Sequence, residues 1–268
     1  MIRRSLLTLA AASLVLAACG QGSEKTAAAD APLLVGATAV PHAEILAHIK
    51  PLLAADGVNI EIKVFNDYVQ PNTQLAERRL DVNYFQTKPY LDEFNASRGS
   101  DLVTVAGVHV EPLGAYSRRF RSLEQLPNGA EVAVPNDASS IGRSLILLQS
   151  AGLIRLKEPA NPLQSLRDIA DNPRGLRFRE LESATLPRVL DQVDMAVINT
   201  NYALDAGLKP KTDALALEGA DSPYVNYLVA RPDNRADPRV AALAAMLRSQ
   251  AVKDFIAAKY DGAVIPAA

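Results

Sequence analysis

From Pro32 onward, short apolar runs that fit strands alternate with longer segments whose apolar residues recur at helical spacing. Leu33–Ala37 is typical of a buried strand, and the next segment places five apolar residues on one helical face: Ile45, Leu46, Ile49, Leu52 and Leu53. This alternation predicts an α/β protein with helices on both faces of mainly parallel sheets. It continues for too long to fit one sheet, so we expect two lobes.

Further strands are expected at regular intervals: Val82–Phe85, Leu102–Val110, Glu131–Pro135, Leu176–Leu181, Ala196–Ile198 and Tyr224–Arg231. Three helical segments have distinctive expected features. Pro51 predicts a kink or short break in the first helix, because proline lacks the N–H that helical hydrogen bonding needs. The polar segment Gln74–Arg79 predicts a short helix. Asp237 and Pro238 predict the start of a final helix that runs to about Tyr260.

The strand order along the chain suggests where it passes between lobes. We expect residues 32–112 and 228–268 to form one lobe and residues 113–227 the other, with the passages at Pro112–Tyr116 and Ser222–Tyr227. Ligands of such folds bind beyond the carboxyl ends of strands, often between domains. Polar residues that follow strands are therefore the first candidates for a binding site.

The N-terminus has the pattern of a secretory signal peptide. Arg3 and Arg4 precede an apolar run from Leu6 to Ala18, which is within the roughly 7–15 residues of a signal-peptide core. The run is too short for a membrane span, which needs about 20 residues. We therefore expect residues 1–18 to be removed, and we expect no transmembrane helix because no other segment is apolar for as long.

The single cysteine of the 268 residues comes directly after this run, in Leu16-Ala17-Ala18-Cys19-Gly20. This segment resembles the bacterial lipobox, in which the cysteine is acylated and becomes the new N-terminus. Residues 19–31 would then be a lipidated cysteine and a flexible tether. The protein is expected on the extracytoplasmic side, at the periplasmic face of the inner or outer membrane if the source is Gram-negative.

Charge and motifs exclude several classes of function. The net charge of −2 argues against a nucleic-acid-binding surface, and no nucleophile elbow, P-loop, dinucleotide fingerprint or zinc-protease motif occurs. We therefore expect neither an enzyme nor a cofactor. His109 and Glu111 would share one face of a strand and could hold a metal. A metal-dependent extracytoplasmic enzyme stays an alternative, as does an adhesive surface lipoprotein, although we predict no metal.

Seven polar segments, each following an expected strand, occur in a recognisable order: Pro41–Glu44, Asp67–Asn72, Asn83–Gln86, His109–Pro112, Pro135–Asp137, Asn199–Ala203 and Ser222–Asn226. Together with the lipobox, they resemble the NlpA/MetQ family of methionine-binding lipoproteins. The resemblance implies a two-lobed periplasmic-binding-protein fold of type II-like architecture that closes on an amino acid. It also implies delivery of methionine to an ABC permease with its ATPase, by a protein that we expect to be a monomer.

The resemblance also implies which residues bind the amino-acid backbone. Arg143 is the expected carboxylate ligand, since a guanidinium binds a carboxylate bidentately and the start of its helix adds a favourable dipole. Asn199 and Asn226 are the expected anchors of the ammonium and carboxylate groups, because an amide side chain both accepts and donates.

The methionine side chain is expected to contact aromatic rings, since sulfur lies favourably at ring edges. The family pattern implies Tyr68, Phe85, His42 and His109 for this pocket, supported from behind by a second group: Tyr84, Gln86, Asn136 and Tyr224.

One position departs from the family pattern, because Thr87 follows Gln86 where many members carry histidine. L-methionine is the expected ligand. D-methionine, a methionine derivative, a short peptide and another small solute stay open as alternatives.

Overall fold

A computed structural model describes residues 31–158 and 161–267. The predicted signal peptide and the lipidated Cys19 lie outside the described residues, as does nearly all of the predicted tether. The chain divides at Pro32 into two units, and the elements below all belong to the unit Leu33–Ala268.

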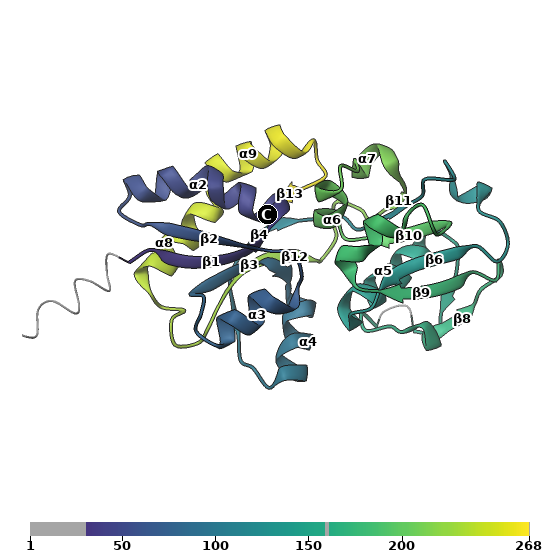
Figure 1. Ribbon diagram of the computed structural model, residues 1–268, viewed down its shortest axis with the longest axis horizontal. Helices are drawn as coiled ribbons and strands as arrows, with labels where there is room; N and C mark the ends of the chain where they lie inside the picture. Colours follow the sequence, from purple (N-terminus) through teal and green to yellow (C-terminus); the bar gives the residue numbers. More distant parts are fainter. Residues whose placement is uncertain (1–30, 159–160, 268) are drawn as a thin grey trace, which may run out of the picture. The chain divides into compact units, whose positions relative to one another are not determined.

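Within the described residues, the first sheet has six strands in the order β13-β4-β12-β3-β1-β2 (Figure 1). Their bounds are β1 Leu33–Thr38, β2 Ile60–Phe65, β3 Val82–Thr87, β4 Val103–Val110, β12 Val225–Ala230 and β13 Ile265–Pro266. The central strands are buried on both faces, as a sheet covered by helices requires.

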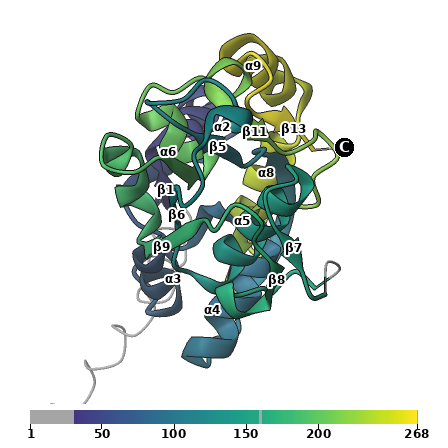
Figure 2. The ribbon, with the colours of Figure 1, turned by 90° about the vertical axis from the view of Figure 1, so that its right-hand side faces the viewer.

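The second sheet has five strands in the described chain, in the order β11-β5-β10-β6-β9. Their bounds are β5 Gly114–Tyr116, β6 Glu131–Pro135, β9 Arg177–Leu181, β10 Met195–Ile198 and β11 Ala214–Leu217. A separate pair, β7 Arg155–Leu156 and β8 Ile169–Asp171, lies near α5 (Figure 2). The chain enters the second sheet between β4 and β5 and returns to the first between β11 and β12.

The predicted α/β class is confirmed, while the strand directions are mixed rather than mainly parallel. Strand β1 pairs in parallel with β2 and β3, and β6 pairs in parallel with β10 and β9. The other pairs within the two sheets are antiparallel. The reason is topological: β12 enters the first sheet from the opposite end when the chain returns, so it runs against both of its neighbours.

Helices cover both faces of the first sheet (Figure 1). On one face lie α2 Glu44–Ala55, α8 Pro238–Leu247 and α9 Gln250–Tyr260, whose apolar residues join the largest buried cluster. On the other face lie α3 Val69–Ala76 and α4 Lys88–Arg98, which contribute Leu75, Leu91 and Phe94 to a second cluster.

The second sheet is also covered on both faces. Helix α5 Ala138–Ser150 packs on one face through Leu145 and Leu148, and η4 Ser183–Val189 and α6 Thr200–Asp205 pack on the other. The shorter helical segments are η1 Ala39–Ala43, η2 Leu123–Gln125, η3 Leu166–Asp168 and α7 Pro210–Asp213.

Three predicted helices differ from the observed ones. Helix α2 runs unbroken through Pro51. Pro51 and Ala47 are both exposed, so water can satisfy the carbonyl that loses its partner. Helix α3 ends at Ala76 instead of covering Gln74–Arg79, because Arg78 has a positive φ of 63°. The single final helix that was expected is two helices, α8 and α9. The second begins at Gln250, because the Ser249 side chain caps its start by accepting a hydrogen bond from the Val252 N–H.

Two smaller differences concern exposure and membrane spans. Leu52, expected on the buried face of α2, is 39% exposed. None of the helices in the described part of the chain is both long and apolar enough to span a membrane.

Candidate ligand-binding site

One pocket, partly open to solvent, lies where strand ends of the two sheets face each other. The pocket lies at this position because strands β3, β4, β6 and β10 end beside it and β12 begins beside it. The carboxyl ends of these strands leave unpaired backbone and polar side chains at one edge of each sheet.

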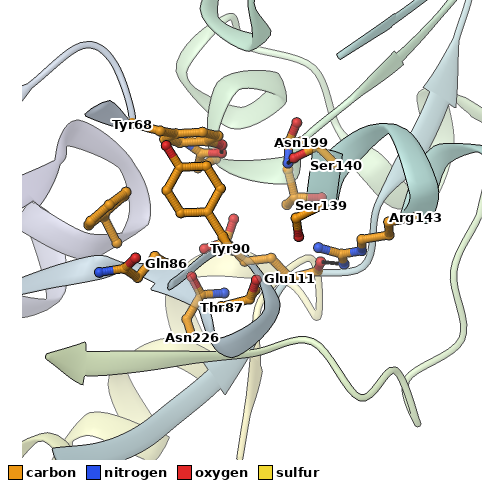
Figure 3. Close-up of a pocket in the computed structure, with 13 residues that line it drawn as sticks. Tyr68, Gln86, Thr87, Tyr90, Glu111, Ser139, Ser140, Arg143, Asn199 and Asn226 are labelled. Carbon is orange, nitrogen blue, oxygen red and sulfur yellow. Dashed lines mark hydrogen bonds between the residues drawn. The ribbon is translucent and has the colours of Figure 1, made fainter. Parts of the chain in front are cut away.

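The pocket has two walls, shown in Figure 3. The first wall comes from elements of the first sheet and consists of Tyr68, Phe85, Gln86, Thr87, Tyr90, Glu111 and Asn226. The second wall comes from elements of the second sheet and consists of Ser139, Ser140, Arg143, Asn199, Thr200 and Asn201. Of the seven principal residues predicted from the sequence, five line this pocket; His42 and His109 do not.

Three aromatic rings of the first wall form a cluster. The Tyr68 ring centroid lies 5.9 Å from that of Phe85 and 5.6 Å from that of Tyr90, and the Phe85 and Tyr90 centroids are 6.0 Å apart. The Tyr68 ring centroid also lies 5.0 Å from that of Tyr202 in α6. The cluster presents apolar ring faces and edges to the pocket, as an aliphatic or thioether side chain requires.

Arg143 of α5 is buried and already paired within the protein. Its Nε donates to Glu218 Oε1 at 2.8 Å, and its Nη2 donates to Glu218 Oε2 at 2.5 Å and to the Glu111 carbonyl oxygen at 2.6 Å. Its guanidinium also lies 4.3 Å from the Tyr224 ring centroid. These contacts hold the planar group rigidly. Nη1 has no protein partner among the described residues, so it is the nitrogen available to a ligand.

Three asparagines contribute amide groups to the pocket. Asn226 Oδ1 lies 3.1 Å from His42 Nε2, and Asn201 Oδ1 accepts from the Tyr68 hydroxyl at 2.6 Å. Asn199 Oδ1 is buried and has no hydrogen-bond partner in the described structure. A buried acceptor without a donor is costly, so Asn199 is placed to accept an N–H from a ligand.

The two predicted histidines lie behind the first wall, where they contact Glu111. His109 Nε2 is 2.8 Å and His42 Nε2 3.3 Å from Glu111 Oε1. Burial lowers the pKa of His42 to about 4 and that of His109 to about 3, so both rings are neutral at pH 7. Burial also raises the pKa of Glu111. The three side-chain ligand atoms lie within 4.8 Å of one another. The His-x-Glu pattern predicted the proximity of His109 and Glu111 and not that of His42.

The expected supporting residues take different places. Tyr84 hydrogen-bonds His109 Nδ1, and Tyr224 stacks on Arg143. Gln86 lines the pocket and is fixed from behind by hydrogen bonds with Asn72 at 2.8 and 2.6 Å. Asn136 is exposed and does not line the pocket, because α5 begins just after it and turns its side chain to solvent.

Sequence reasoning did not single out Tyr90, Asn201 or Glu218 as parts of the site, although Asn201 lies in the segment Asn199–Ala203. Tyr90 and Asn201 follow β3 and β10 by only a few residues, so the rule of polar and aromatic residues after strand ends would have included them. Glu218 carries no such signal, because it is 75 residues from Arg143 in the chain. Glu111 was considered only for metal binding, yet it lines the pocket.

Comparison with known proteins places this arrangement among substrate-binding proteins of transporters. The family model described as NlpA lipoprotein matches residues 33–268. The chain therefore belongs to the NlpA lipoprotein family, as its ordered segments predicted.

Individual relatives agree with that assignment. The chain is 40% identical over 257 residues to the D-methionine-binding lipoprotein MetQ of Salmonella typhi, covering 94% of this chain and 93% of the relative. A nutrient-binding protein from Burkholderia cenocepacia, solved with bound methionine, matches with a TM-score of 0.85 and 42% identity over 88% of this chain and all of the other. A periplasmic substrate-binding protein of an ABC transporter from Coxiella burnetii matches with a TM-score of 0.84 and 41% identity over the same shares.

Proposed function

We propose that this protein captures methionine in the pocket between the two walls and delivers it to an ABC permease driven by its ATPase. One observation carries the proposal: a single pocket joins a three-ring aromatic wall to a buried guanidinium with a free nitrogen. Rings suit a thioether, and the guanidinium suits a carboxylate. Relatives that bind methionine support the assignment.

In this proposal the protein performs no chemistry on its ligand. Residues 32–112 with 228–268, and residues 113–227, would act as two lobes that close when both walls contact methionine. Arg143 Nη1 and the hydroxyls of Ser139 and Ser140 would bind the carboxylate. The ring cluster would enclose the side chain, and Thr87 leaves more room beside it than a histidine would.

Binding is tested with protein that begins at residue 20. Native mass spectrometry before and after denaturation and refolding should show a mass equal to methionine that is lost and then restored by added L-methionine. Ligand at 100 times its dissociation constant should also stabilise the protein by about 2.7 kcal/mol. If neither methionine enantiomer binds but another small solute does, the ligand assignment fails and the solute-binding function stands.

The enantiomer is decided by titrating L- and D-methionine separately into refolded protein. We expect tighter binding of L-methionine. Relatives named for D-methionine make the reverse result informative, since it would reassign the ligand without changing the site.

The same proposal places the protein outside the cytoplasm on a lipid anchor at Cys19, as a monomer. Bacteria that express the full chain in labelled palmitate should incorporate label into the wild type and not into Cys19→Ala. Equal labelling of both would contradict the anchor.

A further inference from the structure

The ion pair between Arg143 and Glu218 lies where the chain passes between the two sheets. Glu218 directly follows β11 and begins the return to the first sheet. Its backbone N–H donates to the carbonyl oxygen of Leu113, on the outgoing passage, at 2.9 Å, and its Oε2 accepts from the Leu113 N–H at 3.0 Å. The Ser222 hydroxyl donates to the same Oε2 at 3.2 Å. Both passages therefore fix the Glu218 carboxylate in place.

Two parallel hydrogen bonds from Arg143 to Glu218 set the direction of the guanidinium. Nε and Nη2 both donate to the carboxylate, at 2.8 and 2.5 Å. Because the guanidinium is planar, such a pair of bonds fixes its orientation as well as its position. The two side chains are only 8% and 14% exposed, so solvent weakens the attraction little. Glu218 thus decides where the free nitrogen, Nη1, points.

A second carboxyl group competes for the same guanidinium. Among the described residues that line the pocket, Glu111 carries the only carboxyl group. Burial raises the pKa of Glu111, and the nearby charge of Arg143 opposes that rise, so the two side chains attract each other. Arg143 nevertheless contacts Glu111 only through its backbone oxygen, at 2.6 Å (Figure 3). In the described part of the chain, the ion pairs of Glu111 are with histidines and that of Arg143 is with Glu218.

We infer that Glu218 is a positioning residue that holds Arg143 away from the Glu111 side chain and directs Nη1 to the ligand carboxylate. The inference rests on the proposed function and adds to it the residue that keeps the carboxylate side of the pocket open. Without the Glu218 charge, the guanidinium would be a buried cation that lacks a counter-ion. It should then turn toward Glu111, and a ligand would have to break that new pair before it could bind.

A double-mutant cycle separates this role from a purely structural one. Wild type, Glu218→Gln, Glu111→Gln and the double variant are titrated with L-methionine by calorimetry. Glu218→Gln should bind methionine about 10-fold more weakly than wild type, because the ligand has to displace Glu111 from Arg143. In the Glu111→Gln background the same substitution should cost less than about 2-fold, since a neutral amide attracts the guanidinium only weakly.

The control is Asp221→Asn, which removes an exposed carboxylate from the same return passage and should bind methionine as wild type does. If Glu218→Gln does not fold, Glu218→Asp replaces it, because aspartate keeps the charge and withdraws it from the guanidinium by one methylene. We then expect a loss of about 3-fold that again disappears in the Glu111→Gln background.

The position of Arg143 is measured directly in crystals of ligand-free Glu218→Gln. We expect a guanidinium nitrogen within hydrogen-bond distance of a Glu111 carboxylate oxygen. This measurement does not need methionine, so it tests the inference even if wild type binds neither enantiomer and the proposed function fails.

Three outcomes would overturn the inference while the proposed function stands. Equal losses of affinity in both backgrounds would make Glu218 a structural residue. Tighter methionine binding by Glu218→Gln would mean that Glu218 competes with the ligand for Arg143. An Arg143 side chain that keeps its wild-type position in the variant crystals would show that Glu218 does not hold it back.

Discussion

The two walls of the pocket are built on different physical principles. In the first wall, the polar groups are tied by a buried network: Glu111 to His109, Asn226 to His42, and Gln86 to Asn72. In the second wall, the polar groups lie on or just before helices. Two of their atoms, Asn199 Oδ1 and Arg143 Nη1, have no hydrogen-bond partner among the described residues. The first wall is therefore arranged before ligand arrives, while the second keeps donors and acceptors available to complete a closed site.

Removing the cation of the second wall should have the largest effect. Arg143→Ala is expected to weaken methionine binding by roughly a thousandfold, because a desolvated carboxylate loses its charged partner. Calorimetric titration measures the loss, with unchanged unfolding of the ligand-free protein as the control. Near-normal affinity would show that α5 and its serines bind the carboxylate without Arg143.

The first wall should show its buried network in the pH dependence of stability. His42 and His109 have pKa values of about 4 and about 3 when folded and 6.5 when unfolded, so below pH 6.5 the unfolded chain binds protons that the folded chain excludes. The contribution of the two histidines to the free energy of unfolding is complete above pH 6.5 and declines as the pH falls. Glu111, with its raised pKa, acts in the opposite direction above pH 4.5.

His109→Gln isolates this effect. Between pH 6.5 and 4 the variant should lose less free energy of unfolding than wild type, by about 1.4 kcal/mol per pH unit. Urea unfolding at several pH values measures it. Parallel curves for wild type and variant would mean that the ring titrates normally.

Asn226 links the network of the first wall to the pocket. Asn226→Ala should weaken methionine binding by about 10-fold, since it removes one amide contact and leaves the His42 N–H with Glu111 alone. The expected loss is smaller than for Arg143→Ala because no charge is removed. A larger loss of affinity than for Arg143→Ala would mean that the first wall contributes more to methionine binding than the second.

The Tyr68 hydroxyl of the first wall donates a hydrogen bond to Asn201 Oδ1 of the second wall at 2.6 Å. Tyr68→Phe keeps the ring and removes only this bond, so affinity should fall by about 2- to 10-fold. A faster dissociation rate in stopped-flow measurements would assign the loss to weaker closure. Unchanged affinity would mean that the bond adds nothing to the closed state.

The fold and the location of the site followed from local patterns. Alternating strand and helix periods indicated an α/β protein. Residues at strand ends and in the helices that follow them contained most of the pocket, including Tyr68, Phe85, Arg143 and Asn226. These features can be recognised in the sequence because burial of one face gives apolar residues a period of two in strands and 3.6 in helices. The polar departures from that period then mark the strand ends.

Only the tertiary structure decided which polar groups are partners. Arg143 and Glu218 are 75 residues apart, Tyr68 and Asn201 133, and His42 and Asn226 184. No local period relates such pairs, so their charges and hydrogen bonds cannot be matched from the sequence pattern. The sequence therefore determined that Glu111 lies at a strand end. Which groups surround its side chain was decided by the tertiary structure, which brings His42 of η1 and His109 of β4 to its oxygen.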